Sequence, residues 1–153
     1  MQQHADKGAE LAMAAFLETN VYSFFGTVLI YGACLPEVSP AGFAALAEQA
    51  DGAYSLCLER DHLNMAITKL TAILGTGRVE RILLASVDRS PHCVQLHYIP
   101  HEIERILPQH IPMERYVVQG DTPIPISSET VELSKSLARL EQLRQEDKLR
   151  GIN

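Results

Sequence analysis

Short apolar runs recur in the first part of the chain. Segments 26–34, 51–59 and 79–88 are almost continuously apolar and are bounded by glycine or acidic residues, a pattern typical of strands buried on both faces of a sheet. Segments with helical spacing of apolar residues separate these runs. The alternation predicts an α/β fold with three layers, in which a doubly wound, mostly parallel sheet of four to five strands lies between helices.

Two serine–proline pairs and one aspartate mark the expected helix starts. Ser39 and Ser90 each precede a proline, which combines a hydroxyl N-cap with the residue favoured at the first helical position. Asp61 can cap a helix that stops at Gly75 or Gly77, because glycine commonly follows a helix end.

The segment after the second serine–proline pair fits two structures. Apolar and polar residues alternate over 93–99 as in a strand, but the apolar positions over 91–107 also share one helical face. We favour the helix, kinked at Pro100, because the serine–proline start is specific and a proline kink is a known device. Beyond it, 114–119 predicts a strand and 122–126 an edge strand, where prolines are tolerated.

Helical patterns flank this unit at both termini. Residues 5–22 predict an N-terminal helix within 1–25, and 127–150 predict a long C-terminal helix, so that the chain forms one domain with its sheet and crossover helices over 26–126. The apolar stripe of the C-terminal helix is incomplete and its other faces carry mixed charge. The helix either docks on its own sheet or protrudes and pairs with a second copy, which predicts a homodimer.

Composition and charge narrow the class of partner. The 153 residues are 46% hydrophobic and 21% charged, as in ordinary globular domains. The net charge of −6 argues against nucleic acid, because phosphates are bound mostly by Lys and Arg. No apolar run is long enough to span a bilayer, and the N-terminus lacks the order of a secretion signal. We therefore expect a cytoplasmic protein that binds neither nucleic acid nor membrane.

The cysteines and two histidines follow the predicted strands. Parallel strands bring their carboxyl ends to one edge of the sheet, where ligands bind in doubly wound folds. Cys34, Cys57 and Cys93 all stand at such ends. His92 lies beside the last cysteine, and His97 lies one helical turn further along the same face. Because thiolates and imidazoles bind zinc and iron, we predict a zinc or iron–sulfur centre held by the three cysteines with His92 or His97.

Other roles stay open for the same residues. Cysteine is among the most often buried residue types, and Cys57 stands between two leucines. Cys93 is about the third residue of the predicted helix, where unpaired backbone N–H groups and the helix dipole favour a thiolate, so a dyad with His97 is conceivable. The cysteine spacing contains no C-x-x-C pair, and neither a dinucleotide-binding glycine motif nor a nucleophile elbow is present.

Charged residues occupy the same strand ends. Arg60 and Arg89 stand at matching points after the second and third strands, and Asp88 directly precedes Arg89. An arginine can hold a carboxylate or phosphate through paired hydrogen bonds, although a solvated loop arginine needs no such role. Arg60, Arg89 and Asp88 are therefore candidates for binding a small ligand.

Two stretches resemble proteins of anaerobic redox metabolism. "RILLASVDRSPH" (81–92) is similar to a strand and turn of heterodisulfide reductase flavoprotein subunits. "ADGAYSLCLERDHLN" (50–64) resembles a cysteine-bearing strand of the small iron–sulfur subunits that join hydrogenases to that reductase. Val87 stands where the flavoprotein segment has cysteine, and the closely spaced cysteines of the small subunit are missing. The resemblance implies a redox accessory subunit with a redox protein as its partner.

Two functions are thus compatible with the sequence. In the first, a small cytoplasmic α/β protein binds a metal, an iron–sulfur centre or a small ligand at the carboxyl ends of its strands. In the second, the chain is a non-catalytic, homo-oligomeric interaction or regulatory module without metal, whose cysteines belong to the core.

Overall fold

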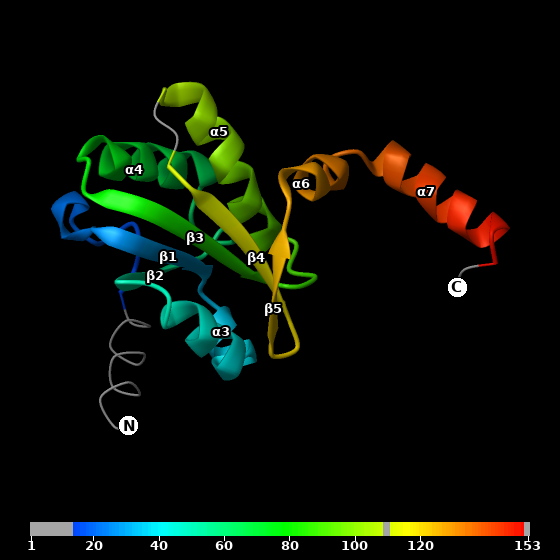
Figure 1. Cartoon of the computed structure of the whole chain (residues 1–153), viewed down its shortest axis with the longest axis horizontal. Coiled ribbons are helices and arrows are strands. Elements are labelled where there is room, and N and C mark those ends of the chain that lie inside the picture. The colour runs from blue at the N-terminus through cyan, green and yellow to red at the C-terminus, as the bar shows by residue number, and fades with distance from the viewer. Residues whose placement is uncertain (1–13, 109–110, 152–153) are drawn as a thin grey trace.

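Five strands form one sheet in the computed structural model, which describes residues 14–108 and 111–151. The strand order is β2-β1-β3-β4-β5. The first four strands are parallel, and β5 runs antiparallel to β4 (Figure 1). Their bounds are β1 Gly26–Gly32, β2 Gly52–Leu56, β3 Val79–Val87, β4 Met113–Gln119 and β5 Thr122–Ile126. The doubly wound, mostly parallel sheet predicted from the sequence is confirmed.

Helices cover both faces of the sheet (Figure 1). One face carries α4 (Leu63–Gly75) and α5 (Ile99–Ile106), and the other carries α2 (Leu35–Val38) and α3 (Pro40–Ala47). The chain leaves β1 through α3 on one face, and reaches β3 and β4 through α4 and α5 on the other. Right-handed crossovers require this switch of face because the strand order reverses between β1 and β3.

The apolar runs are continuous because both faces of the strands are buried. On β1, Val28 and Ile30 pack against the α4 and α5 side, whereas Leu29 and Tyr31 pack against the α3 side. None of these four side chains is more than 1% exposed. A strand that alternated apolar and polar residues would place polar groups in one of these two cores.

The helix start predicted at Ser39 is confirmed, and the helix cap predicted at Asp61 is wrong. The Ser39 hydroxyl accepts a hydrogen bond from the Gly42 amide at 3.1 Å, which caps α3. Asp61 does not cap α4, whose N-cap is His62 without a side-chain bond. The carboxylate of Asp61 instead pairs with Arg60 at 3.0 Å.

The ambiguous segment after Pro91 is helical, so its reading as a strand is wrong. A 3₁₀ helix, η2 (Cys93–Tyr98), leads directly into α5. The Ser90 hydroxyl accepts a hydrogen bond from the Cys93 amide at 3.3 Å. Pro100 lies in the first turn of α5, where its missing N–H costs no helical hydrogen bond. The predicted kink is therefore a junction between two helices.

The N-terminal segment forms no α-helix where the structure describes it. Ala15 makes a parallel bridge with Ser55 of β2, and the 3₁₀ helix η1 (Val21–Ser23) follows. Phe16 and Phe24 are buried in the core on the α4 side. The helix predicted over 5–22 is thus wrong for its described part, and its remainder lies outside the described residues. The bridge covers the edge of β2, which would otherwise expose unpaired backbone groups.

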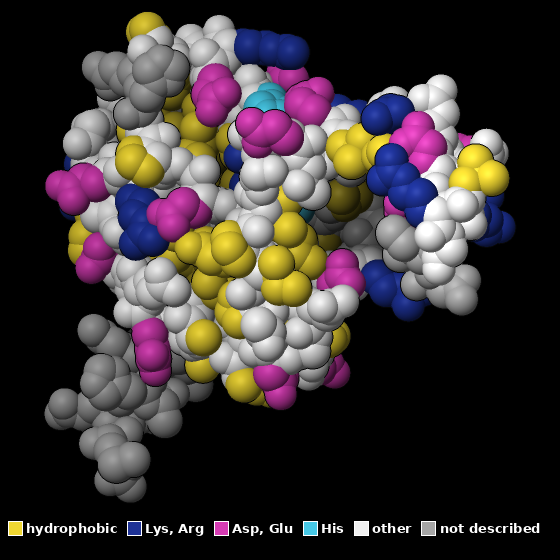
Figure 2. Space-filling view, turned by 45° about the vertical axis from the view of Figure 1, so that its right-hand side comes forward, with side chains coloured by type: hydrophobic (Ala, Val, Ile, Leu, Met, Phe, Trp, Pro, Cys, Tyr) yellow, Lys and Arg dark blue, Asp and Glu magenta, His cyan; other side chains and the backbone are white. Residues whose placement is uncertain are grey.

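The C-terminal segment consists of two helices instead of one long helix. They are α6 (Ser128–Ser134) and α7 (Leu137–Leu149), and the Ser136 hydroxyl accepts a hydrogen bond from the amide of Arg139 in the first turn of α7. Val131 anchors α6 to the body with 3% of its surface exposed, whereas α7 buries none of its residues. This arm, α7, projects from the body, with Lys, Arg, Asp and Glu over much of its visible surface (Figures 1 and 2). Docking of a single long helix on the sheet is therefore wrong.

Candidate functional site

The position where the strand order reverses is filled by a cysteine side chain. Doubly wound folds bind ligands in the crevice between the two strands at this point, which here are β1 and β3. A methyl group at Gly32, the last residue of β1, would lie only 2.7 Å from Sγ of Cys93. Glycine therefore permits the first residue of η2 to close the crevice.

The three cysteines lie at this edge of the sheet. Cys34 is exposed after β1, Cys57 is partly buried after β2, and Cys93 is buried. Burial is the largest cause that raises the pKa of the Cys93 thiol; the Ser90 hydroxyl lowers it, and charge on the other two thiols raises it further. The expectation that the helix start favours a Cys93 thiolate is wrong, because desolvation outweighs it.

The two predicted histidine ligands lie apart from one another. His92 is exposed, and its Nδ1 is 4.0 Å from the Glu59 carboxylate. Nε2 of His97 is 2.7 Å from Oγ of Ser86 on β3. The prediction placed His97 on the face of Cys93 by assuming α-helical geometry. A 3₁₀ helix has three residues per turn, so residues four apart do not share a face.

The predicted metal ligands therefore do not form a coordination site in this conformation. Within 14–108 and 111–151, no group of three His, Cys, Asp or Glu side chains is arranged to hold a metal ion. Three thiolates are one ligand short of an all-cysteine iron–sulfur site. Of the two histidines expected to complete the set, His92 is exposed near Glu59 and His97 bonds to Ser86 through Nε2.

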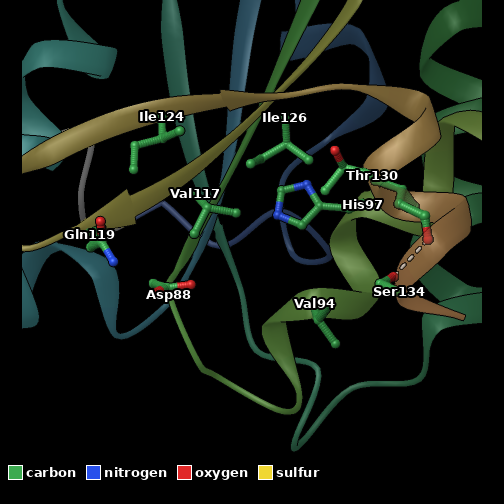
Figure 3. A pocket seen from close by; sticks show the side chains of 10 residues that line it. Asp88, Val94, His97, Val117, Gln119, Ile124, Ile126, Thr130 and Ser134 are labelled. Atoms are coloured by element: carbon green, nitrogen blue, oxygen red, sulfur yellow. Dashed lines mark hydrogen bonds between the residues drawn. The ribbon is translucent and has the colours of Figure 1, made fainter. Parts of the chain in front are cut away.

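A hollow opens beside the closed crevice, at the carboxyl ends of β3 and β4 (Figure 3). Its inner part has a volume of about 240 Å³, and its apolar wall consists of Val94, Val117, Ile124, Ile126 and Val131. Its outer part, about 260 Å³, reaches the loop after β3. The two parts adjoin, because the same four residues line both: Asp88, Val94, His97 and Val117.

The hollow exists because the helical layer is thin over the last two strands. Val117 of β4 is paired with Ile124 of β5, and Arg115 is paired with Ile126. These side chains lie on the α5 face of the sheet. Only η2 and the short α6 border this part of the sheet, and α6 is anchored by a single buried residue, Val131.

His97 presents an unpartnered polar atom in the wall of the hollow. Its side chain is 3% exposed, and its Nδ1 has no hydrogen-bond partner among the described residues. Burial, helped by the charge of Arg115, lowers the pKa of His97 to about 4, so the ring is neutral at pH 7. Figure 3 shows the ring between Val117 and Thr130. Nδ1 is itself enclosed by protein atoms, and a buried polar atom left without a partner costs about 1–3 kcal/mol of stability.

Arg115 holds the wall behind His97. The guanidinium is buried at 6% exposure; its Nε donates to the His97 carbonyl at 3.2 Å and its Nη1 donates to the Ser128 hydroxyl at 3.2 Å. Arg115 therefore connects η2 to the start of α6. Arg115 lies within a strand that the sequence predicts, but no motif marks it as a functional residue. Because residues two apart in a strand share a face, its spacing from Val117 would have placed this arginine on a buried face.

The pair of Ser86 and His97 favours binding over nucleophilic catalysis. A hydroxyl 2.7 Å from an imidazole nitrogen has the geometry of a nucleophile and its base. However, Ser86 is only 2% exposed, so its hydroxyl presents little surface to a substrate even though the residue borders the outer part of the hollow. No acidic side chain among the described residues bonds to Nδ1 to orient the ring. The bond therefore fixes the position of the His97 ring in the wall of the hollow.

The predicted ligand-binding residues divide into two groups. Asp88 lines both parts of the hollow and Arg89 lines the outer part. Arg60 lies outside it and pairs with Asp61 on the loop after β2. Arg89 has a φ of +66°, the left-handed region, which costs an ordinary L residue roughly 1–2 kcal/mol.

Comparison with known protein families agrees with this architecture. The model of a Rossmann-like domain family matches residues 26–150. The chain belongs to the Rossmann-like domain family. No curated protein and no solved structure matches it. The match runs from the first residue of β1 past the end of α7, so this Rossmann-like domain includes the hollow and the arm. In the part of the chain that the structure describes, no helix is both long and apolar enough to cross a membrane.

Proposed function

We propose that this Rossmann-like domain binds a small organic ligand in the hollow at the carboxyl ends of β3 and β4. The observation that carries the proposal is a cavity with a mostly apolar wall at the carboxyl ends of β3 and β4, lined also by Asp88 and His97. The inner and outer parts measure about 240 and 260 Å³, and together they fall within the size range of ordinary small-molecule sites, ~300–1,000 Å³.

The composition of the walls supports the same function. Binding sites for small molecules are mostly apolar with a few placed polar groups that orient the ligand. Here valine and isoleucine side chains form most of the inner wall, and Asp88, His97 and Gln119 supply polar atoms. Two of these three lie at the carboxyl ends of the parallel strands or just beyond them, where this class of fold binds its ligands.

Indole, a neutral planar molecule, is a suitable first probe. We expect indole to shift the methyl NMR signals of Val94, Val117 and Ile126. The substitution Ile124→Trp fills the inner part and should abolish these shifts while leaving the other methyl signals of the core unchanged. The matched control is Met65→Trp, because Met65 is an exposed apolar residue of α4 outside the hollow. Equal indole binding by both variants would contradict the proposal.

A zinc or iron–sulfur centre at the thiol edge stays a prediction from the sequence. The location of all three cysteines at this edge of the sheet supports it, and the separate positions of the histidines weigh against it. Protein purified without oxygen should then contain stoichiometric metal that is lost in Cys93→Ser. Absence of metal from the parent protein would favour the interaction module, in which the cysteines belong to the core. The redox accessory role and its redox partner depend on the same measurement.

The homodimer also stays a prediction, supported by the geometry of the arm. The helix α7 buries no residue within its own chain, and Leu137 and Leu149 are 78% and 89% exposed. Pairing with a second copy would cover these side chains. Sedimentation should show a dimer that dissociates in Leu137→Lys, and a parent protein that is monomeric at all concentrations would contradict this.

A further inference from the structure

We infer that Ser128 is a phosphorylation site whose phosphate pairs with the guanidinium of Arg115. The inference goes beyond the proposed function, because it does not depend on what the hollow binds. It follows from the surroundings of Arg115, a buried cation that donates a hydrogen bond to the hydroxyl of an exposed serine.

Arg115 carries a buried charge without a bonded carboxylate. The residue is 6% exposed, and within 14–108 and 111–151 it forms no ion pair and its Nη2 has no hydrogen-bond partner. Burial lowers the pKa of the guanidinium, whereas the charges of Glu104 and Glu129 raise it. A buried cation without a bonded anion is unfavourable, so a negative group placed beside Arg115 would be stabilised.

Ser128 is the point from which a negative group can reach this charge. Its Oγ accepts a hydrogen bond from Nη1 of Arg115 at 3.2 Å, and the residue is exposed. The other guanidinium nitrogens are less accessible, because Nη2 is enclosed by protein atoms and Nε bonds to the His97 carbonyl. A free anion would have to displace the serine hydroxyl from Nη1. A phosphate on that same oxygen displaces nothing, so the geometry favours a covalent modification.

The modification requires a kinase and a nucleoside triphosphate. Oγ of Ser128 forms a bond to the γ-phosphorus, the bond from that phosphorus to the diphosphate breaks, and the hydroxyl proton passes to a base of the kinase. The product carries a charge of about −1.5 to −2 at pH 7, and its oxygens accept stronger hydrogen bonds from a guanidinium than a neutral hydroxyl does. Because Arg115 also bonds to η2 and Ser128 is the first residue of α6, the phosphate would strengthen the connection between these two walls of the hollow.

The first test compares two chains that carry phosphoserine at position 128 or at position 127. Ser127 is the matched control, because it adjoins the same helix start and the same Glu129, but its hydroxyl accepts a hydrogen bond from the Thr130 amide at 3.2 Å. The second pKa of phosphoserine is ordinarily about 6, and a nearby cation lowers it. In the folded protein, phosphorus NMR should find this pKa about one pH unit lower at position 128 than at position 127. In urea the difference should vanish.

His97 provides a second measurement on the same chains. The charge of Arg115 is one of the causes that lower the pKa of His97, so a phosphate that compensates this charge should raise the pKa. A pH titration of the imidazole NMR signals measures the shift, which should be larger with phosphoserine at 128 than at 127. Neither comparison needs a substitution of Arg115, so neither depends on the folding of such a variant.

Three outcomes would overturn the inference. Equal phosphoserine pKa values at the two positions, or unfolding caused by phosphoserine at 128 alone, would show that Arg115 does not hold the phosphate. If inorganic phosphate shifts the Arg115 Nε–H signal of the unmodified chain as strongly as phosphoserine at 128 does, the site binds a free anion and the covalent assignment is wrong. Finally, mass spectrometry should find phosphate on Ser128 after the chain is incubated with ATP and an extract of its native cells. Phosphate at other positions alone, or at none, would contradict the assignment.

Discussion

The crevice between β1 and β3 and the hollow beside β4 and β5 lie at the same edge of one sheet but differ in what occupies them. In the crevice, Sγ of Cys93 packs against Gly32 and leaves no room for a methyl group. In the hollow, apolar walls enclose a cavity, and the buried Nδ1 of His97 has no partner among the described residues. One predicted ligand, Cys93, therefore packs the closed region, whereas the predicted residues Asp88 and His97 line the open one together with strand residues that carry no motif.

The difference has a cause in the geometry of η2. Because this helix has three residues per turn, Cys93 and His97 lie on different sides of it: Cys93 approaches β1, and His97 lies in the wall of the hollow. One short helix thus closes the usual ligand position and forms part of the wall of the hollow. Substitutions at or beside Cys93 and His97, toward the two ends of η2, test this difference between the crevice and the hollow.

The largest expected effect is the pH dependence contributed by His97. Its pKa in the folded protein is about 4, below the value of ~6.5 in an unfolded chain. As the pH falls from about 6.5 to about 4, the unfolded chain takes up a proton that the folded protein resists, so the free energy of unfolding decreases by about 3 kcal/mol, and below this range the loss levels off. Urea denaturation at a series of pH values measures the slope.

The control for this slope is His97→Gln, which keeps a polar atom for Ser86 but does not titrate. The carboxylates of the domain titrate in both proteins, and Arg115 stays charged throughout, so their contributions cancel in the difference. The stability advantage of the parent over the variant should shrink as the pH falls from 7 to 4. Parallel curves would show that His97 is solvated and that the hollow is not as described.

A smaller effect is expected from closing the gap between β1 and η2 further. Gly32→Ala places a methyl group 2.7 Å from Sγ of Cys93, and such overpacking lowers the free energy of unfolding by about 1–3 kcal/mol. Adding Cys93→Ala should recover most of this loss, which thermal or urea unfolding would measure. The matched control is Gly75→Ala, because no heavy atom lies within 4 Å of its added methyl group. If Gly32→Ala is as harmless as that control, the crevice is open.

The sequence predicted the sheet well because strand burial is a local pattern. The continuous apolar runs of β1 and β3 and the serine–proline start at Ser39 each identify their element without knowledge of the rest of the fold. The C-terminal break was missed because a single hydroxyl, that of Ser136, restarts the helix within a region of uniform composition. The N-terminal segment was missed because its bridge to Ser55 is a long-range contact.

The candidate site was predictable only in part. Asp88 and Arg89 were identified because they follow a confident strand, and they do line the hollow. His97 was identified as functional but was oriented wrongly, since the sequence does not distinguish a 3₁₀ turn from an α-helical one. Arg115 supports the wall behind His97, and Ile124 forms part of the apolar wall. These roles depend on where α5 and α6 begin and end over the sheet, and such tertiary packing leaves no local pattern in the sequence.

The smallest effect concerns the loop that joins the closed and open regions. Arg89 adopts a φ of +66°, which glycine tolerates without strain. Arg89→Gly should therefore raise the free energy of unfolding by about 0.5 kcal/mol, because relief of roughly 1–2 kcal/mol of backbone strain exceeds the added entropy of a glycine in the unfolded chain. Arg60→Gly is the matched control, since Arg60 is an exposed loop arginine without a positive φ, and this substitution should lower stability. If both variants lose stability equally, the Arg89 side chain itself holds the mouth of the hollow. Its role would then be a contact with a ligand or with a neighbouring loop, in addition to connecting the two regions.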